Sequence, residues 1–436
     1  MTMEIQNKSA ATLPVRAADF INAVGVNTHL DQAGNSASTI IADMAYLGLN
    51  HIRNASLSGQ SSQFVVRDMG YLATAGLNFD FVTRAAIPGT LKAVAAFAAL
   101  FPGAVSSLEG PNEVNNFPFY YNGLSGTAAA VAYQTDLYAA EKANPALAQI
   151  PVLNFTDNPY TTAPSDASNF HPYPANGGQP LAALALDYAK AQAAAPGDPV
   201  YFTEAGYATG PKLAGGQGVD ALTQAKLALN LIMDAAQLGI AATYLYTLTD
   251  DGTDPAKIVN NYGLFTATGG AKPSAVAIHN LTGLLADPGA GSNTFTPRAL
   301  NYTLTGLPAS GSRLLIQKSN GVYDLVVWAE PTIWNAVTHT RIRVAPTTVS
   351  VDLGAIFKSV AVFDPLSSAS PISSASNAQT LTLAVTDHPL VIQVSNLAAA
   401  MSALAPAAAA VLSSSPAAAG LTHPRLLASA GPHALH

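Results

Sequence analysis

Two short segments each place one glutamate where an apolar run gives way to glycine, proline and aromatic residues. The first is Gly-Pro-Asn-Glu-Val-Asn around Glu113, and the second is Tyr-Phe-Thr-Glu-Ala-Gly-Tyr around Glu204. In a barrel enzyme, a glutamate at the C-terminal end of a strand faces the substrate. Two such carboxylates can supply the proton donor and the nucleophile that cleave a glycosidic bond, about 5–5.5 Å apart in a retaining enzyme. The pair predicts acetal cleavage, provided that the fold brings the two segments together.

The elements that must position these glutamates alternate between apolar strands and alanine-rich helical stretches. Eight predicted strands lie between residues 18 and about 285, at 22–28, 51–55, 79–83, 105–109, 152–155, 169–171, 200–203 and 242–246. Strand–helix alternation of this length predicts an α/β fold that closes as a (β/α)8 TIM barrel. On this count Glu113 follows strand four and Glu204 ends strand seven, so both open on one face of the barrel.

The pattern changes after about residue 290. Short runs of alternating polarity, separated by turn residues, replace the helical periodicity and predict a C-terminal β-sandwich. Its predicted strands lie at 299–304, 313–317, 323–328, 340–344, 348–353, 360–363, 381–385 and 390–394. We therefore expect an N-terminal extension over 1–17, a catalytic barrel over 18–288 and a β-sandwich over 289–396. Alanine, serine and proline dominate 397–436, which we expect to be a disordered tail.

Composition excludes several classes of protein. Charged residues make up 10% of the chain and the net charge is −7, with no basic patch, so no nucleic-acid partner is expected. No apolar run approaches the roughly 20 residues of a transmembrane segment. The absence of cysteine removes disulfides, thiolate catalysis and cysteine metal sites. Residues 1–8 lack the apolar core of a secretory signal; an extracytoplasmic location is favoured and a cytoplasmic one is the alternative.

Both glutamate segments resemble those of one clan of enzymes. Asn112-Glu113 matches the Asn-Glu acid/base signature of the retaining glycoside hydrolases with a (β/α)8 barrel, and Thr203-Glu204-Ala205-Gly206 matches their strand-seven nucleophile motif. The resemblance covers roughly residues 18–285, and the β-sandwich makes the chain most similar to family 39 and its exopolysaccharide-cleaving relatives. It implies hydrolysis of β-linked glycosides or polysaccharide with retention, Glu113 as acid/base, Glu204 as nucleophile and no cofactor. The partner is a carbohydrate substrate, and the oligomeric state is undetermined.

The resemblance also implies two residues that assist the pair. Arg53, after strand two, resembles the arginine that supports the nucleophile, and a guanidinium there would keep Glu204 ionised and oriented. Asn112 would donate its amide to the sugar 2-hydroxyl. The charge on the nucleophile, together with partial burial, predicts a raised pKa for Glu113.

Aromatic and histidine side chains complete the expected substrate site. His171 and Tyr173 resemble the strand-six pair, in which the tyrosine hydroxyl binds the nucleophile. The clan usually has a tryptophan after strand eight; this chain has none there, and Tyr246 or Tyr244 takes its place. His29, after strand one, is a candidate ligand to sugar hydroxyls.

Each assignment has a simpler structural alternative. Glu113 could cap a helix or pair with a lysine, and Glu204 could form only a buried ion pair with Arg53. Glu109 competes for the donor role, although it lies inside a predicted strand. His171 and His29 could be ordinary structural hydrogen-bonding partners.

Two further clusters stay open. The aromatic residues of segment 117–121 could line the substrate groove or pack under a long loop. Asp250, Asp251 and Asp254 suggest calcium by carboxylate number, but their spacing matches no EF-hand, and no metal ligands are assigned. At the level of function, a transglycosylase on the same machinery and a catalytically inactive carbohydrate-binding barrel are the alternatives.

Overall fold

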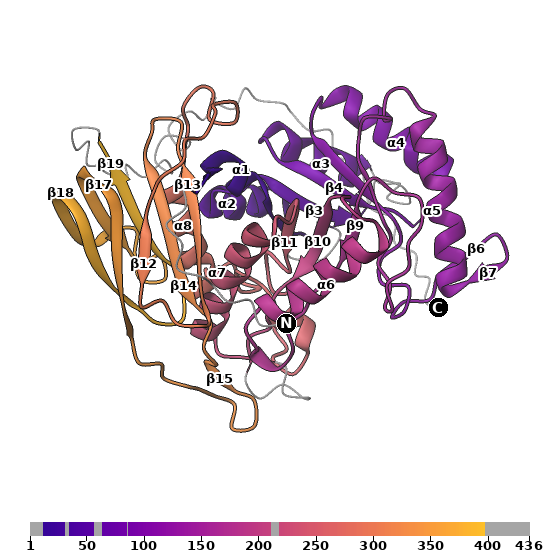
Figure 1. Ribbon diagram of the computed structural model, residues 1–436. Helices are drawn as coiled ribbons and strands as arrows, with labels where there is room; N and C mark the ends of the chain where they lie inside the picture. The colour runs from indigo at the N-terminus through magenta and orange to yellow at the C-terminus, as the bar shows by residue number, and fades with distance from the viewer. Residues whose placement is uncertain (1–11, 31–34, 56–62, 85, 211–217, 397–436) are drawn as a thin grey trace, which may run out of the picture. The chain divides into compact units, whose positions relative to one another are not determined.

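The computed structural model describes residues 12–30, 35–55, 63–84, 86–210 and 218–396. Eight parallel strands form the barrel that the sequence predicts (Figure 1), in the spatial order β8-β5-β4-β3-β2-β11-β10-β9. A parallel bridge between Leu153 and Ala167, beside β9, nearly closes the ring. The strands are β2 (Val24–Asn27), β3 (His51–Ala55), β4 (Asn78–Val82), β5 (Val105–Glu109), β8 (Val152–Leu153), β9 (Ser168–Phe170), β10 (Val200–Ala205) and β11 (Ala242–Leu245).

Helices connect the strands and cover the barrel. They are α1 (Ala17–Asn22), α2 (Ala37–Leu47), α3 (Gln63–Thr74), α4 (Ile87–Leu100), α5 (Gly126–Lys142), α6 (Leu181–Ala194), α7 (Ala221–Leu238) and α8 (Pro273–Leu285), with the short 3₁₀ helices η1 (Ala175–Gly177) and η3 (Ile258–Asn261). α7 begins where the Asp220 side chain accepts a hydrogen bond from the Thr223 amide, and it ends at Gly239 in the left-handed conformation. The strands are buried on both faces, which explains their nearly continuous apolar sequences.

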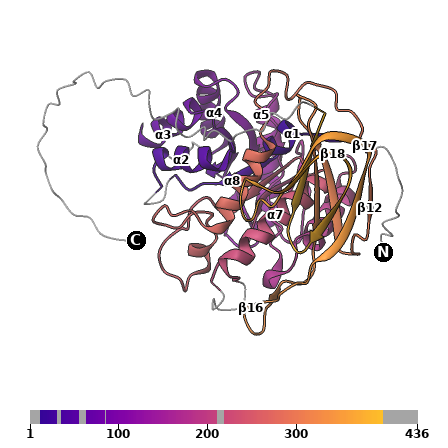
Figure 2. The same ribbon diagram turned by 90° about the vertical axis from the view of Figure 1, so that its left-hand side faces the viewer.

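A separate, mainly antiparallel sheet follows the barrel (Figure 2) and encloses a second apolar core. It runs β1-β13-β14-β19-β17-β12, with β18 on the other edge of β17. Its strands are β1 (Val15–Arg16), β12 (Thr303–Thr305), β13 (Gly311–Gln317), β14 (Tyr323–Ala329), β17 (Thr347–Phe363), β18 (Pro371–Val385) and β19 (Leu390–Ser395). Hairpins β15 (Trp334–Asn335)–β16 (Thr340–Arg341) and β6 (Tyr120–Tyr121)–β7 (Leu124–Ser125) stand apart from the two large sheets.

Three details of this sheet differ from the expectation. The runs at 348–353 and 360–363 belong to one long strand, because β17 continues through the segment around Gly354 with only a shift of register against β18. The run at 340–344 contributes only to the β15–β16 hairpin. Val15 and Arg16, from the expected N-terminal extension, pair in parallel with β13. The expected tail lies outside the described residues.

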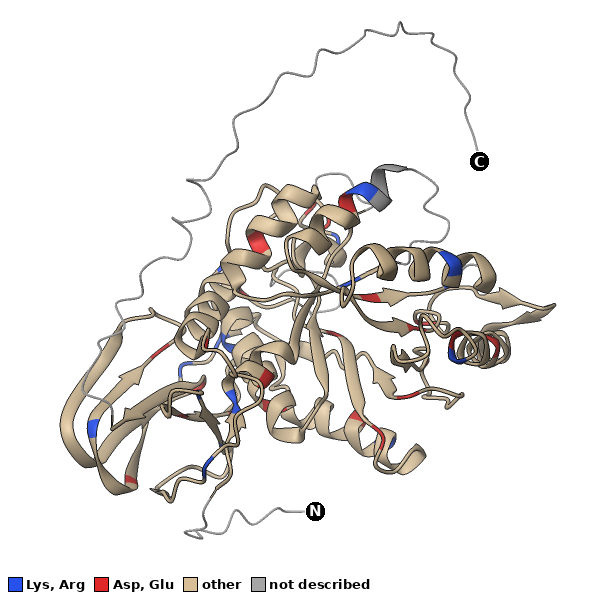
Figure 3. Ribbon diagram, turned by 90° about the horizontal axis from the view of Figure 1, so that it is seen from above, with Lys and Arg blue, Asp and Glu red and all other residues tan. Residues whose placement is uncertain are grey.

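Polar side chains link the barrel helices to the C-terminal sheet. The indole of Trp328 donates to the buried Asp234 of α7 over 3.1 Å, and Lys226 of the same helix pairs with Asp387 over 2.7 Å. Charged residues are sparse along the described part of the ribbon (Figure 3), where they form no continuous basic stripe. No helix in the described ranges is both long and apolar enough to cross a bilayer.

Candidate active site

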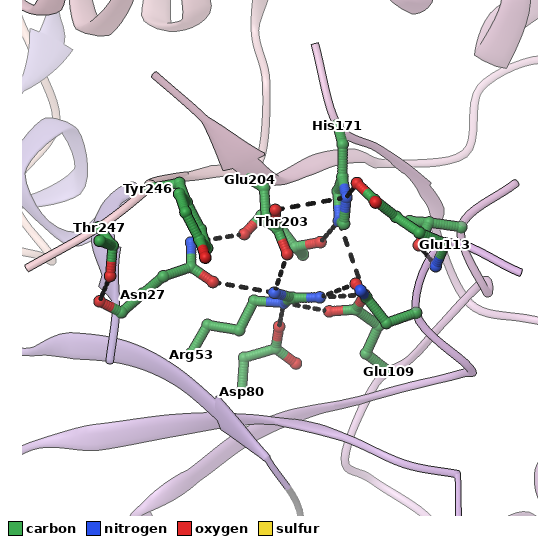
Figure 4. A network of polar contacts seen from close by, with 12 residues as sticks. Asn27, Arg53, Asp80, Glu109, Glu113, His171, Thr203, Glu204, Tyr246 and Thr247 are labelled. Carbon is green, nitrogen blue, oxygen red and sulfur yellow. Dashed lines mark hydrogen bonds and ion pairs between the residues drawn. The ribbon is translucent and has the colours of Figure 1, made fainter. Parts of the chain in front are cut away.

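Arg53 is the centre of a buried polar network at the C-terminal end of the barrel (Figure 4). Its guanidinium donates two hydrogen bonds to Glu109, over 2.7 and 2.8 Å, in a bidentate pair. It also donates to Glu204 over 2.6 Å, to Asn27 over 2.9 Å and to Asn112 over 2.8 Å. Burial opposes the charge, but the carboxylates of Glu109 and Glu204 outweigh it and raise the pKa of Arg53.

Glu109, the competing candidate for the proton donor, instead belongs to the hydrogen-bond network of Arg53. It ends β5 with its side chain fully buried, and both of its carboxylate oxygens accept hydrogen bonds from Arg53. Burial alone would raise the pKa of Glu109, but the charge and hydrogen bonds of Arg53 lower it. A carboxylate that is held ionised under a guanidinium is a poor proton donor.

Glu204 lies near the end of β10, and both of its oxygens have partners. Arg53 donates to Oε1, and the Tyr173 hydroxyl donates to Oε2 over 2.6 Å. Tyr173 itself is partly buried, and burial together with the charge of Glu204 raises its pKa, so its hydroxyl keeps the proton that it donates. The carboxylate is thus fixed from two sides.

Glu113 lies in the loop after β5 and has different surroundings. Its backbone has φ +40°, an unusual conformation for a residue with a side chain, and its amide donates to Thr156 over 2.8 Å. One carboxylate oxygen contacts Nδ1 of His171 over 2.8 Å, and the other accepts from the Asn116 amide over 2.8 Å. Glu113 is therefore held in an orientation set by His171 and Asn116.

The expected raised pKa of Glu113 is wrong. Burial does raise it, but the hydrogen bond and positive charge of His171, followed by the hydrogen bond from Asn116, lower the pKa of Glu113 to about 2. The expected rise rested on the nucleophile's negative charge and on partial burial, without the contact between His171 and Glu113. His171 follows β9, and its Nε2 lies 3.0 Å from the Thr203 hydroxyl.

The two candidate carboxylates come together from segments 91 residues apart in the sequence. One oxygen of Glu113, one of Glu204 and a ring nitrogen of His171 lie within 4.8 Å of one another. Such a donor set could also hold a divalent cation. Its setting is unfavourable for one, since the Arg53 guanidinium lies 2.6 Å from Glu204.

A cavity of about 650 Å³ opens over this network and is lined by both glutamates, Arg53, Asn112 and Tyr173. His29 and Tyr246 line the same cavity, and their rings meet edge to face at 5.6 Å. Tyr244 is buried within the barrel, so of the two candidate tyrosines only Tyr246 reaches the cavity.

The segment that follows Glu113 divides between two environments. Phe117 is exposed and lines the cavity, whereas Phe119 is buried against Tyr133. Tyr121 also packs on Tyr133, and Tyr120 is 75% exposed on the β6–β7 hairpin. Only Phe117 of this cluster is placed to meet a ligand in the cavity.

The acidic trio after β11 does not gather into a metal site. Asp250 pairs with Lys272 over 2.7 Å and accepts from the Gly263 amide. The hydroxyl of Tyr246 donates to Asp251 over 3.4 Å. Asp250 and Asp251 thus bind neighbouring protein groups.

Sequence reasoning missed several members of the network. Asp80 is fully buried, accepts from Ser107 over 2.7 Å and lies 4.0 Å from Arg53; burial, followed by the charge of Glu109, raises its pKa. Tyr262 lines the cavity and packs edge to face on Tyr173 and Tyr246. Polar residues inside otherwise apolar strands, such as Asp80 in Asn-Phe-Asp-Phe-Val, were the available signal.

Comparison with known proteins bears on the fold. No protein-family model matches the sequence, and no curated protein matches it. Among solved structures, a family 39 glycoside hydrolase from the gut symbiont Bacteroides cellulosilyticus WH2 superposes with a TM-score of 0.58 at 14% identity, over 87% of this chain and 82% of its own. A glucosidase from Croceicoccus marinus superposes with a TM-score of 0.58 at 12% identity, over 90% of this chain and 100% of its own. The expected likeness to family 39 is confirmed at the level of fold: the chain is similar to the family 39 structure in its barrel and in the β-sheet domain attached to it.

Proposed function

We propose that the chain is a glycoside hydrolase that cleaves β-linked glycosides with retention of configuration. The observation that carries the proposal is the approach of the Glu113 and Glu204 oxygens to within 4.8 Å of each other. Retaining enzymes hold their carboxyl groups about 5–5.5 Å apart, and inverting enzymes hold them about 6.5–9.5 Å apart to admit a water. The short separation supports double displacement.

In the first step, an oxygen of Glu204 attacks the anomeric carbon while the bond from that carbon to the leaving oxygen breaks. Arg53 and Tyr173 each donate a hydrogen bond to the attacking carboxylate and hold it in place. Glu113 gives a proton to the leaving oxygen. Because the pKa of Glu113 is lowered to about 2, that proton is supplied through the contact of Glu113 with Nδ1 of His171, 2.8 Å away.

In the second step, Glu113 is a carboxylate again and takes a proton from water. The water oxygen attacks the anomeric carbon, the ester bond to Glu204 breaks, and the sugar leaves with its original configuration. The proton on Glu113 then returns to His171. Arg53 occupies the amide oxygen of Asn112, so the amide nitrogen of Asn112 is its donor toward the sugar 2-hydroxyl. His29 and Tyr246 bind the remainder of the sugar in the cavity.

Two alternatives share this site. A transglycosylase would use the same intermediate and pass the sugar to an acceptor other than water. A carbohydrate-binding barrel without activity would need no paired carboxylates, and the fully hydrogen-bonded Glu204 and Glu113 favour catalysis over it.

The test compares Glu204→Ala with Glu113→Ala on a panel of 4-nitrophenyl β-glycosides and β-linked polysaccharides. We expect Glu204→Ala to lose roughly 10⁴–10⁶-fold in kcat, the scale for removal of a nucleophile from a catalytic unit. Azide should restore turnover in both variants, with inverted product from Glu204→Ala and retained product from Glu113→Ala. A retained azide product from Glu204→Ala, or full activity in that variant, would refute the assignment.

A further inference from the structure

A second cavity, of about 310 Å³, meets the first at Glu113. Glu113, Asn116 and Tyr173 line both cavities. Glu204 and Arg53 line only the larger one. The second cavity is instead bordered by His171 and by the part of α6 that carries Asp187 and Lys190.

The position of this cavity assigns it to one end of the substrate. A sugar whose anomeric carbon contacts Glu204 lies in the larger cavity, with the leaving oxygen at Glu113. The group bonded to that oxygen then extends from Glu113 away from the nucleophile. Of the two cavities, the smaller one is bordered by the proton donor and not by the nucleophile.

We propose that this second cavity binds the leaving group, and that the leaving group is a neutral, hydroxyl-rich sugar recognised by Asp187 and Lys190. The inference rests on the proposed function and adds to it the chemical class of the unit beyond the scissile bond. It also identifies two residues of α6 as determinants of specificity.

The lining has the two kinds of surface that a sugar ring requires. Leu186 is exposed at this cavity, so apolar surface is available to the C–H face of a ring. Tyr160, which is partly buried and stacks on the buried Phe170 with centroids 4.2 Å apart, also lines the cavity. The polar edge includes Asp187 and Lys190, whose ion pair spans 2.7 Å. An ammonium has three donors and a carboxylate has about four acceptor positions, so the pair keeps capacity for hydroxyl groups.

The charge of the lining selects against acidic sugars. Besides Glu113 and His171, it contains Asp157, Asp187 and Lys190, so carboxylates outnumber basic groups. Asp157 is already bound by the Thr127 hydroxyl over 2.6 Å. An added carboxylate would meet repulsion from Asp157 and Asp187, and the charge of Lys190 is already paired with Asp187. A purely apolar leaving group would cover the Asp187–Lys190 pair without replacing the water bound to it.

The test measures how the glycosyl-enzyme partitions between acceptors. Enzyme that turns over a 4-nitrophenyl β-glycoside is supplied in parallel with glucose, glucuronate or ethanol at equal concentration, and transfer products are quantified. We expect wild-type enzyme to transfer to glucose in preference to glucuronate. Asp187→Ala and Lys190→Ala should each lower the ratio of glucose transfer to ethanol transfer by about tenfold, since a hydrogen bond to a charged group is lost.

The matched control is Asp19→Ala, which removes a partly exposed ion pair of the same spacing, Arg16–Asp19, outside both cavities. It should leave the ratio unchanged. Wild-type ratios in both α6 variants, or a preference for glucuronate, would overturn the inference while the hydrolase assignment stands. Absence of nitrophenol release from every glycoside would overturn the hydrolase assignment and the leaving-group cavity with it.

Discussion

Replacing His171 by phenylalanine should raise the pKa of Glu113 from about 2 toward its ordinary value of 4.5. Burial raises this pKa, and the hydrogen bond and charge of His171 are the largest effects that lower it. The difference between 2 and 4.5 corresponds to about 3 kcal/mol, at roughly 1.36 kcal/mol for each tenfold change in the protonation equilibrium. Phenylalanine keeps a flat ring at this position and removes both effects.

The measurement is a ¹³C NMR titration of protein labelled at the glutamate side-chain carboxyl. The chain has six glutamates, so the spectrum has six resonances, and Glu113→Gln identifies the one that matters. Asn116→Ala is the comparison, because it removes a weaker stabilising contact and should raise the same pKa by less. In His171→Phe, the alkaline limb of kcat/KM should follow the pKa of Glu113 itself.

Two results would refute this reasoning. A Glu113 resonance that still titrates near 2 in His171→Phe would mean that other groups hold the carboxylate ionised. A wild-type Glu113 resonance that titrates above the pH of the activity assay would mean that Glu113 carries its own proton at rest. The relay from Nδ1 of His171 would then be unnecessary.

Two further predictions concern stability and metals. Burial lowers the pKa of His388, but Asp364 and Asp387 raise it above its ordinary value of 6.5. The stability that protonated His388 contributes is therefore fully present below pH 6.5 and is lost as pH rises through the raised pKa of the folded protein. His388→Gln should therefore lower the free energy of unfolding by about 1–3 kcal/mol at pH 5 and by less at pH 9, measured by urea denaturation; a larger loss at pH 9 would contradict this. EDTA should leave glycosidase activity unchanged, because the chemistry proposed for the two carboxylates needs no cation; a loss that Zn²⁺ restores would show that they bind one.

The sequence predicted the barrel because its signals are local. Each barrel strand is a short apolar run bounded by turn residues, and Gly48 and Gly239 end helices where the left-handed conformation is needed. Four of the strand ends place Arg53, Glu113, His171 and Glu204 on one face by topology alone. The C-terminal sheet was less predictable, because the length of β17 depends on its pairing with β18 and not on its own pattern.

The buried network around Arg53 joins residues that are far apart in the chain, and the sequence does not show which of them meet. Asp80, Ser107 and Glu109 appear as polar interruptions of apolar strands, and only the barrel's closure shows that they surround Arg53. The lowered pKa of Glu113 has the same origin, since His171 lies 58 residues away in the chain. The residue types alone predicted the chemistry of the site, whereas the pKa of Glu113 depends on neighbours that only the fold brings together.

The charges of the buried groups together suit the proposed transition state. Burial and the charge of Glu109 raise the pKa of Asp80, and the guanidinium of Arg53 donates hydrogen bonds to the carboxyl groups of both Glu109 and Glu204. An oxocarbenium-like state carries positive charge at the anomeric carbon, and the carboxylate of Glu204 beside that carbon stabilises it. Formation of the ester then removes the charge of Glu204 at the moment when the positive charge on the sugar is lost.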